Sequence, residues 1–247
     1  MIRLLSAELL KLRTTWGFWI YLVLMLGITT LAVVGTILSD EGAFDAENFA
    51  DLLETPVIVF LFPLLIGSVI VTNEFRHGTI GQTLLVTPRR ERLLAVKLAT
   101  AGLVGLLFAA LSYGLVLAIS LPWLAAKDAD ASLTDRVVAE TALVVLVGFL
   151  LLAAFGAAVG GAVRSQVGSV IGLLVWFLLL EFLVAALLSV IGLDAVPRYL
   201  PVAASGAIVG GAEDEEILSQ VGGAIVMLAW VALAAGAAAL SLRRDVT

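Results

Sequence analysis

The sequence predicts an all-α, polytopic membrane protein with six transmembrane helices, an amphipathic amino-terminal helix in the membrane interface and both termini in the cytoplasm. Three observations lead to this prediction. First, 62% of the 247 residues are hydrophobic and 14% are charged, whereas soluble domains have about 45–50% apolar and about 25% charged residues. Second, the apolar residues form six long runs. Third, lysines and arginines gather in alternate connections between those runs.

Each of the six runs is long enough to cross a bilayer as a helix. About 20 apolar residues, rising about 1.5 Å each, cross about 30 Å of hydrocarbon. The runs are continuous, whereas the strands of a transmembrane barrel alternate apolar and polar residues. The predicted spans are residues 17–38, 55–72, 98–124, 137–163, 165–193 and 217–242 of a single transmembrane domain, 1–247.

A secretory signal peptide is the alternative interpretation of the first run. It would have an apolar core of about 7–15 residues followed by a small-residue cleavage site. Residues 17–38 form a longer run, and acidic residues follow it. A retained transmembrane helix is therefore favoured.

Lysine and arginine mark one side of the predicted topology. Eleven of the 14 lie in the amino-terminal segment, after the second and fourth spans, or in the carboxyl-terminal tail. The positive-inside rule then places both termini in the cytoplasm, which agrees with an even number of spans. The acidic residues between 40 and 54 lie in the first outer loop and are consistent with this orientation.

Residues 1–16 predict a helix lying in the cytoplasmic interface. At about 100° per residue, its apolar side chains share one face and its charged side chains lie elsewhere. The apolar face comprises Ile2, Leu5, Leu9, Leu12 and Trp16, and the charged residues are Arg3, Glu8 and Lys11. The alternative is a basic flank that only sets the topology.

The connection at residues 73–97 contains signals for a short helix between the second and third spans. Gly78 can end a helix and Thr79 can cap a new one. Thr87 and Pro88 repeat such a start signal before the third span. Residues 79–86 would then form a helix parallel to the membrane, either as a docking surface for a cytoplasmic partner or as part of a solvated loop.

Glu181 is the one acidic residue deep within a predicted span. A carboxylate there costs about 2.5–3.5 kcal/mol, so it should face the protein interior. Ser112 and Tyr113 of the third span are candidate partners at a similar depth. Glu181 either lines a translocation path or makes a structural hydrogen bond between helices, and the sequence favours neither.

Pro63 lies about halfway along the predicted second span. It would kink that helix and open backbone toward a cavity, or else form a kink tolerated by packing. The last outer loop, residues 194–216, is more apolar after Pro201 than a solvated loop should be.

The charged connection resembles a known family. The string Glu74-x-Arg76-x-Gly78-Thr79, followed by Leu84-Leu85, Pro88, Arg92 and Lys97, is similar to the sequence after the second span of ABC type-2 exporter permeases. The segment from Glu8 to Arg13 resembles the start of small bacterial members that work with separate ATPases.

The resemblance implies that residues 79–86 are the coupling helix, which fits a groove in the ATPase subunit. It assigns this coupling to Glu74, Arg76, Gly78, Thr79, Ile80, Leu84 and Arg92. It also implies a partly re-entrant outer loop at 194–216, and pairing with a second permease copy or a homologous permease.

The implied function is a permease in the cell membrane that exports a hydrophobic or amphipathic substrate such as a drug, peptide antibiotic or lipid. The interior polar residues are mostly Ser, Thr and Tyr, which favours such a substrate, and Glu181, Pro63 and Tyr113 are its candidate path. The sequence has no G-x-x-x-x-G-K-[ST] loop, so ATP and Mg²⁺ would bind to the partner ATPase and no cofactor to this chain.

Other function classes have less support. With no cysteine and one histidine, His77, a metal site is not expected. The spans also lack a catalytic constellation for an intramembrane enzyme. Membrane lipid is an expected partner and nucleic acid is not. The alternative function is a membrane anchor that docks a cytoplasmic partner and transports nothing.

Overall fold

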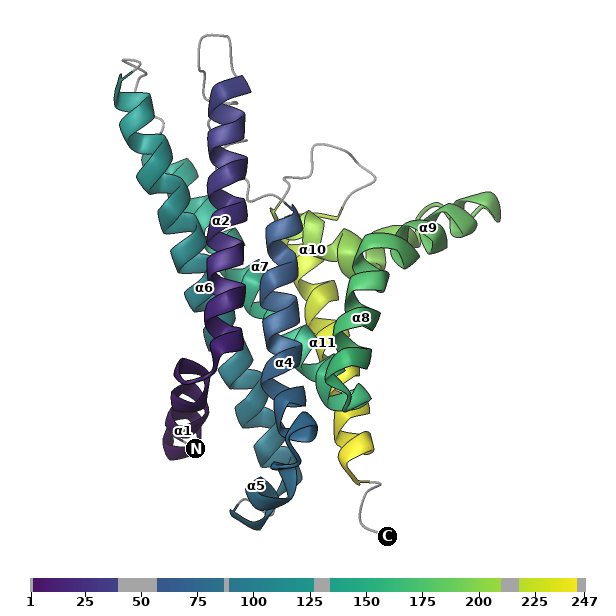
Figure 1. Ribbon diagram of the computed structural model, residues 1–247. Helices are drawn as coiled ribbons and strands as arrows, with labels where there is room; N and C mark the ends of the chain where they lie inside the picture. Colours follow the sequence, from purple (N-terminus) through teal and green to yellow (C-terminus); the bar gives the residue numbers. More distant parts are fainter. Residues whose placement is uncertain (1, 40–56, 87–88, 127–133, 210–217, 244–247) are drawn as a thin grey trace.

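A computed structural model describes residues 2–39, 57–86, 89–126, 134–209 and 218–243. They form a bundle of long helices with shorter helices at its two ends, and the described ranges contain no strand (Figure 1). The elements are α1 (Ile2–Arg13), α2 (Trp16–Ser39), η1 (Val57–Phe60), α4 (Leu61–Arg76), α5 (Ile80–Val86), α6 (Arg90–Ala126), α7 (Thr134–Val163), α8 (Gln166–Val175), η3 (Trp176–Leu180), α9 (Glu181–Val190), η4 (Pro197–Tyr199), α10 (Pro201–Val209) and α11 (Gln220–Arg243).

Five helical segments are long and apolar enough to cross a bilayer, which makes this a multi-pass membrane protein. They are Trp16–Leu38, Arg90–Trp123, Ala139–Val163, Gln166–Val190 and Gln220–Leu242. These segments correspond to the first, third, fourth, fifth and sixth predicted spans. The third predicted span, residues 98–124, begins earlier in the structure, because α6 runs without a break from Arg90. Arg92 and Lys97 therefore lie on this helix rather than in a connection.

The second predicted span, residues 55–72, corresponds to η1 and α4. The α-helical part, Leu61–Arg76, has 16 residues and is short for a crossing on its own. Residues 55 and 56 lie outside the described ranges. Pro63 is in the first turn of α4, not halfway along a helix, and there a missing N–H costs no hydrogen bond. The expected mid-span kink is therefore replaced by a change from 3₁₀ to α-helix just before this proline.

Helix α7 lies at the centre of the bundle and packs against α4, α6 and α11. Its contact with α4 is between backbones. A Cβ atom on Gly156 would lie 1.8 Å from the carbonyl oxygen of Leu64, and one on Gly67 would lie 2.0 Å from that of Ala153. Glycines permit this approach. Gly160 also packs closely on α4, since a Cβ atom added there would lie 2.8 Å from the carbonyl oxygen of Ser68.

The fifth predicted span is not one straight helix. Its π-helical segment η3 separates α8, which follows the bundle, from α9, which turns away from it (Figure 1). A π segment is a recognised cause of such a bend. Beyond the turn, α10 packs against α11 and α7, with Ala204, Ala207 and Ile208 buried. Residues 210–216 of the predicted outer loop lie outside the described ranges.

The start of α1, helix α5 and the end of α11 all lie at one end of the bundle, which we call the α5 end (Figure 1). Helix α10 lies toward the opposite end, the α10 end. The described start of α1 and end of α11 are therefore on the same side of the bundle.

We expect Gly156→Ala to destabilise the protein, because its new Cβ would collide with the backbone of α4. Overpacking of this kind costs about 1–3 kcal/mol. Gly172→Ala on α8 is the matched control, because nothing lies within 4 Å of a Cβ added there. Thermal unfolding in detergent should show a lower midpoint for the first variant only. Equal midpoints would contradict the close contact between α4 and α7.

Candidate functional site

Helix α4 ends in a tight backbone turn at the α5 end. Gly78 has a φ of +66°, which an L residue rarely adopts. The N–H of Thr79 donates to the carbonyl oxygen of Glu74 at 3.0 Å, and that of Gly78 to Phe75 at 3.3 Å. This pair of bonds is a Schellman motif, and it satisfies the last carbonyls of the helix. Gly78 thus ends the helix as its residue type predicts.

Helix α5 begins at Ile80, directly after that turn. Thr79 stands at its N-cap position, because its carbonyl oxygen accepts the N–H of Thr83 at 3.1 Å. Ile80 is half-buried, whereas Leu85 is 85% exposed. The predicted short helix is therefore present, and it presents an exposed leucine beyond the bundle.

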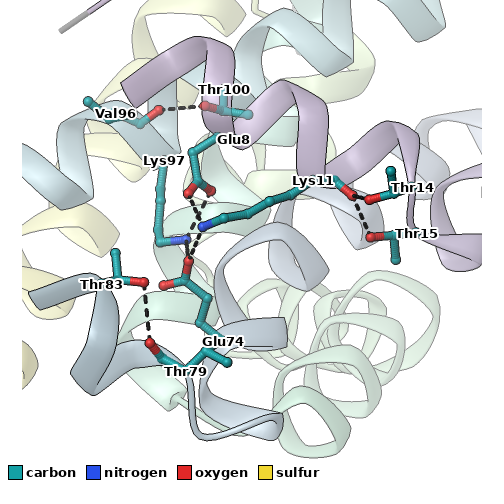
Figure 2. A network of polar contacts seen from close by, with 10 residues as sticks. All are labelled: Glu8, Lys11, Thr14, Thr15, Glu74, Thr79, Thr83, Val96, Lys97 and Thr100. Carbon is teal, nitrogen blue, oxygen red and sulfur yellow. Dashed lines mark hydrogen bonds and ion pairs between the residues drawn. The ribbon is translucent and has the colours of Figure 1, made fainter. Parts of the chain in front are cut away.

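Two lysines and two glutamates form a closed ion-pair network beside the last turn of α4, which leads into α5 (Figure 2). Lys11 Nζ lies 2.7 Å from Glu8 Oε1 and 3.0 Å from Glu74 Oε1. Lys97 Nζ lies 3.2 Å from Glu8 Oε2 and 3.1 Å from Glu74 Oε1. The network joins α1, α4 and α6, with each carboxylate between the two ammonium groups.

Three members of this network are buried. Lys97 is 2% exposed, and Glu8 and Glu74 are 7% exposed each. Burial raises the pKa of Glu8, but the charge of Lys97 and the hydrogen bond from Lys11 outweigh it and leave the pKa below its usual value. Burial likewise lowers the pKa of Lys11, but its bonds to both carboxylates outweigh this and raise it. Both shifts favour the ionised forms at neutral pH.

Comparison with known families identifies the protein. A family model described as an ABC-2 family transporter protein matches residues 4–130. That range covers just over half of the chain and contains all four network residues. The chain belongs to this family. A search of the curated proteins found no match. The predicted recognition is thus confirmed, and the protein is a membrane permease of the ABC-2 type.

The other residues predicted to couple the permease to an ATPase have differing surroundings. Arg76 is exposed, and its Nη1 donates to Gln166 Oε1 at 3.2 Å, which joins the end of α4 to the start of α8. Arg92 is exposed on α6. The side chain of Leu84, and residues 87–88 with the predicted start signal of α6, lie outside the described part of the chain.

The contact of Glu8, Lys11 and Lys97 with Glu74 was not predicted from the sequence. A signal was present, because Lys97 lies between the apolar Val96 and Leu98 on a transmembrane helix and requires an acidic partner. Glu8 also precedes Lys11 by one helical turn. The sequence does not say which acid meets which base, because that depends on how α1 folds back on α4 and α6.

Glu181 of the permease holds the start of α10. Its Oε2 accepts hydrogen bonds from the backbone N–H of Val202 and from Trp176 Nε1, both at 2.9 Å, and its Oε1 accepts the N–H of Ala203 at 2.8 Å. Pro201 occupies the first position of α10 and has no N–H. A carboxylate at a helix N-terminus is also favoured by the helix dipole. Glu181 is 5% exposed and both of its oxygens have partners.

Ser112 and Tyr113, the partners expected for Glu181, lie in other surroundings. Ser112 Oγ lies 3.2 Å from Thr29 Oγ1 on α2. Tyr113 is 7% exposed within the hydrophobic core, and Pro63 is buried in the first turn of α4. The hydrogen bonds to Glu181 come instead from η3 and α10.

We expect Lys97→Met to destabilise the permease strongly, because two buried carboxylates would share only the half-exposed Lys11. Breaking a buried ion pair costs about 3–5 kcal/mol. The double variant Glu8→Gln, Lys97→Met restores neutrality and should recover part of this loss. Thermal midpoints of both single variants and the double variant give the coupling, and Arg92→Met on the exposed face of α6 is the control. Strictly additive effects would contradict the network.

We expect Glu181→Leu to release α10, because two backbone N–H groups would lose their acceptor. Each buried unsatisfied group costs about 1–3 kcal/mol. The chain has no cysteine, so Ala207→Cys on the buried face of α10 gives a single label site. Its maleimide labelling should be at least about tenfold faster beside Glu181→Leu. Phe182→Leu, exposed one residue away, should leave the rate unchanged. Equal rates in both backgrounds would show that Glu181 does not hold α10.

Proposed function

We propose that this chain is the membrane-spanning subunit of an ATP-driven exporter in the cytoplasmic membrane. It moves a hydrophobic or amphipathic substrate, such as a drug, peptide antibiotic or lipid, out of the cell. A separate ATPase subunit binds ATP and Mg²⁺ and docks on α5. Membership of the ABC-2 family supports a permease. The turn between α4 and α5, with the ion-pair network beside it, supports the docking site.

The observation that carries this proposal is that α5 directly follows the end of α4, which the ion-pair network joins to α6 and α1. Helix α5 follows the Schellman turn of α4 directly, and the last helical residues of α4 include Glu74. Glu74 bonds to Lys97 of α6 and Lys11 of α1. A force applied to α5 would therefore act on α4 through the connecting turn, and on α6 and α1 through the ion pairs of Glu74.

The orientation of the proposal follows from the distribution of charge. With η1 and α4 as the sixth crossing, both termini lie on one side, and the excess of lysine and arginine assigns that side to the cytoplasm. Helix α5 then faces the ATPase. Helix α10 lies toward the outer surface as the re-entrant element of the 194–216 loop.

We place the substrate path between two permeases, the second being another copy or a homologous chain. The buried hydroxyls of the chain are engaged inside the bundle: Ser68 Oγ donates to Ser169 Oγ at 2.8 Å, and Thr100 Oγ1 to the carbonyl oxygen of Val96 at 2.8 Å. Pro63, Tyr113 and Glu181 are likewise buried. Their role in the path stays a prediction, and it requires a movement that exposes them.

The test is to co-purify the chain with its ATPase and to measure ATP hydrolysis with and without the permease. Leu85→Glu should abolish co-purification and the change in ATPase rate, because a charge would replace the exposed apolar contact of α5. Leu38→Glu is the matched control, since Leu38 is 79% exposed at the α10 end against 85% for Leu85. It should leave both readouts unchanged.

Two results would count against the proposal. Normal ATPase coupling in Leu85→Glu would show that α5 is not the docking element. Normal docking without substrate-dependent ATP hydrolysis or export would favour the alternative, a non-transporting anchor.

A further inference from the structure

A cavity of about 620 Å³ opens beside the ion-pair network at the α5 end. Its walls come from α1, the start of α2, α4, α5 and the start of α6. The walls change in character along the bundle. The lining residues of α2 and α4 farthest from α5 are apolar, Phe18, Ile66 and Val69, and those at α5 are polar, Thr79, Gln82 and Thr83. The start of α6 adds the apolar Leu93 and Val96.

Glu74 is one of the lining residues, and one of its carboxylate oxygens lacks a hydrogen bond. Glu74 is 7% exposed, and its Oε2 is buried with no hydrogen-bond partner among the described residues. Figure 2 shows this oxygen turned away from the two ammonium groups that bind Oε1. Buried carboxylate oxygens in proteins are normally bonded, so a missing partner calls for an explanation. A hydrogen-bond donor from outside the chain would supply it.

A second group in the wall has a hydrogen-bond donor to spare. The ammonium group of Lys11 has three N–H donors, and two of them serve Glu8 and Glu74. The Lys11 side chain is 54% exposed. It can therefore bind an anionic group at the mouth of the cavity while the carboxylate behind it binds a cation.

We propose that this cavity binds a phospholipid whose headgroup carries a primary amine. The ammonium of the headgroup donates to Glu74 Oε2, the phosphate lies near Lys11, and one acyl chain follows the apolar wall beside Phe18 and Ile66. The order of polar and apolar walls matches the order of headgroup and chain in one leaflet of a bilayer. The occupant would join α1 to α4 and fill space next to the coupling segment.

The chemistry separates this lipid from other occupants. A choline headgroup has the same charge but no N–H, so it cannot satisfy Glu74 Oε2. A soluble amine could satisfy it but would leave the apolar wall uncovered. Selectivity for a primary amine together with a requirement for acyl chains is therefore diagnostic.

The experiment measures lipid retained by the purified full-length chain with native mass spectrometry. Phosphatidylethanolamine and phosphatidylcholine with identical acyl chains are titrated separately. We expect the first to bind about tenfold more tightly, equivalent to about 1.4 kcal/mol. Equal affinities would overturn the proposal. So would displacement of the bound lipid by an equal concentration of glycerophosphoethanolamine, which has the headgroup and no chains.

Two variants localise the binding. Glu74→Gln should remove the preference between the two lipids, and Ala7→Phe, at another lining residue, should weaken binding of phosphatidylethanolamine about tenfold by filling the cavity. Ala99→Phe, on an exposed face of α6 outside the cavity, is the matched control. If Glu74→Gln fails to fold, Ala7→Phe decides. Equal phosphatidylethanolamine binding by Ala7→Phe and Ala99→Phe would place the lipid elsewhere. The measurement needs no ATPase, so its outcome is separate from that of the proposed function.

Discussion

The arrangement of this permease depends on the need to bury charges together. A single ion moved out of water costs several kcal/mol, and only close partners of opposite charge recover it. Glu8, Glu74 and Lys97 are each less than a tenth exposed, so α1, α4 and α6 must meet where these side chains meet. Helix α1 depends on this most, because Glu8 is the only buried side chain between residues 4 and 13. Charge pairing thus helps to set the position of the amino-terminal helix, together with the packing of Leu12 against the core.

The α10 end solves the same problem with different partners. There Glu181 is paired with two backbone N–H groups and an indole rather than with lysines. A helix N-terminus carries a partial positive charge and unsatisfied donors, so it can accept a carboxylate without a second charged residue. The π segment before Glu181 accompanies the turn that brings the carboxylate to α10. The difference has a physical consequence. The ion-pair network at the α5 end joins three helices, whereas Glu181 at the α10 end joins α9 to the short helix α10.

The sequence predicted the features that depend on composition along the chain and missed those that depend on which helix faces which. The long apolar runs predicted five crossing helices. Gly78, as a helix-ending residue, predicted where α4 ends and the short helix α5 follows. The bend at η3 was not predicted, because Trp176–Leu180 is as apolar as its neighbours and a π segment has no distinctive residue pattern. The partners of Glu181 and Lys97 were missed for a related reason. In a helix that is apolar on all sides, periodicity carries little information about its neighbours.

The packing also limits how a movement at α5 can spread through the permease. Gly67 and Gly156 bring the backbones of α4 and α7 so close that no side chain fits between them, and helices in such contact move together rather than slide. The network adds α6 and α1 to the same unit. By contrast, α9 makes its main contacts with η3 and η4 only, and Glu181 is the link from that segment to α10. If the ATPase acts on α5 as proposed, α4 would carry the motion to α7 through this backbone contact, and to α1 and α6 through the network. Glu181 belongs to the segment outside this unit, and its bonds from the N–H groups of Val202 and Ala203 join that segment to α10.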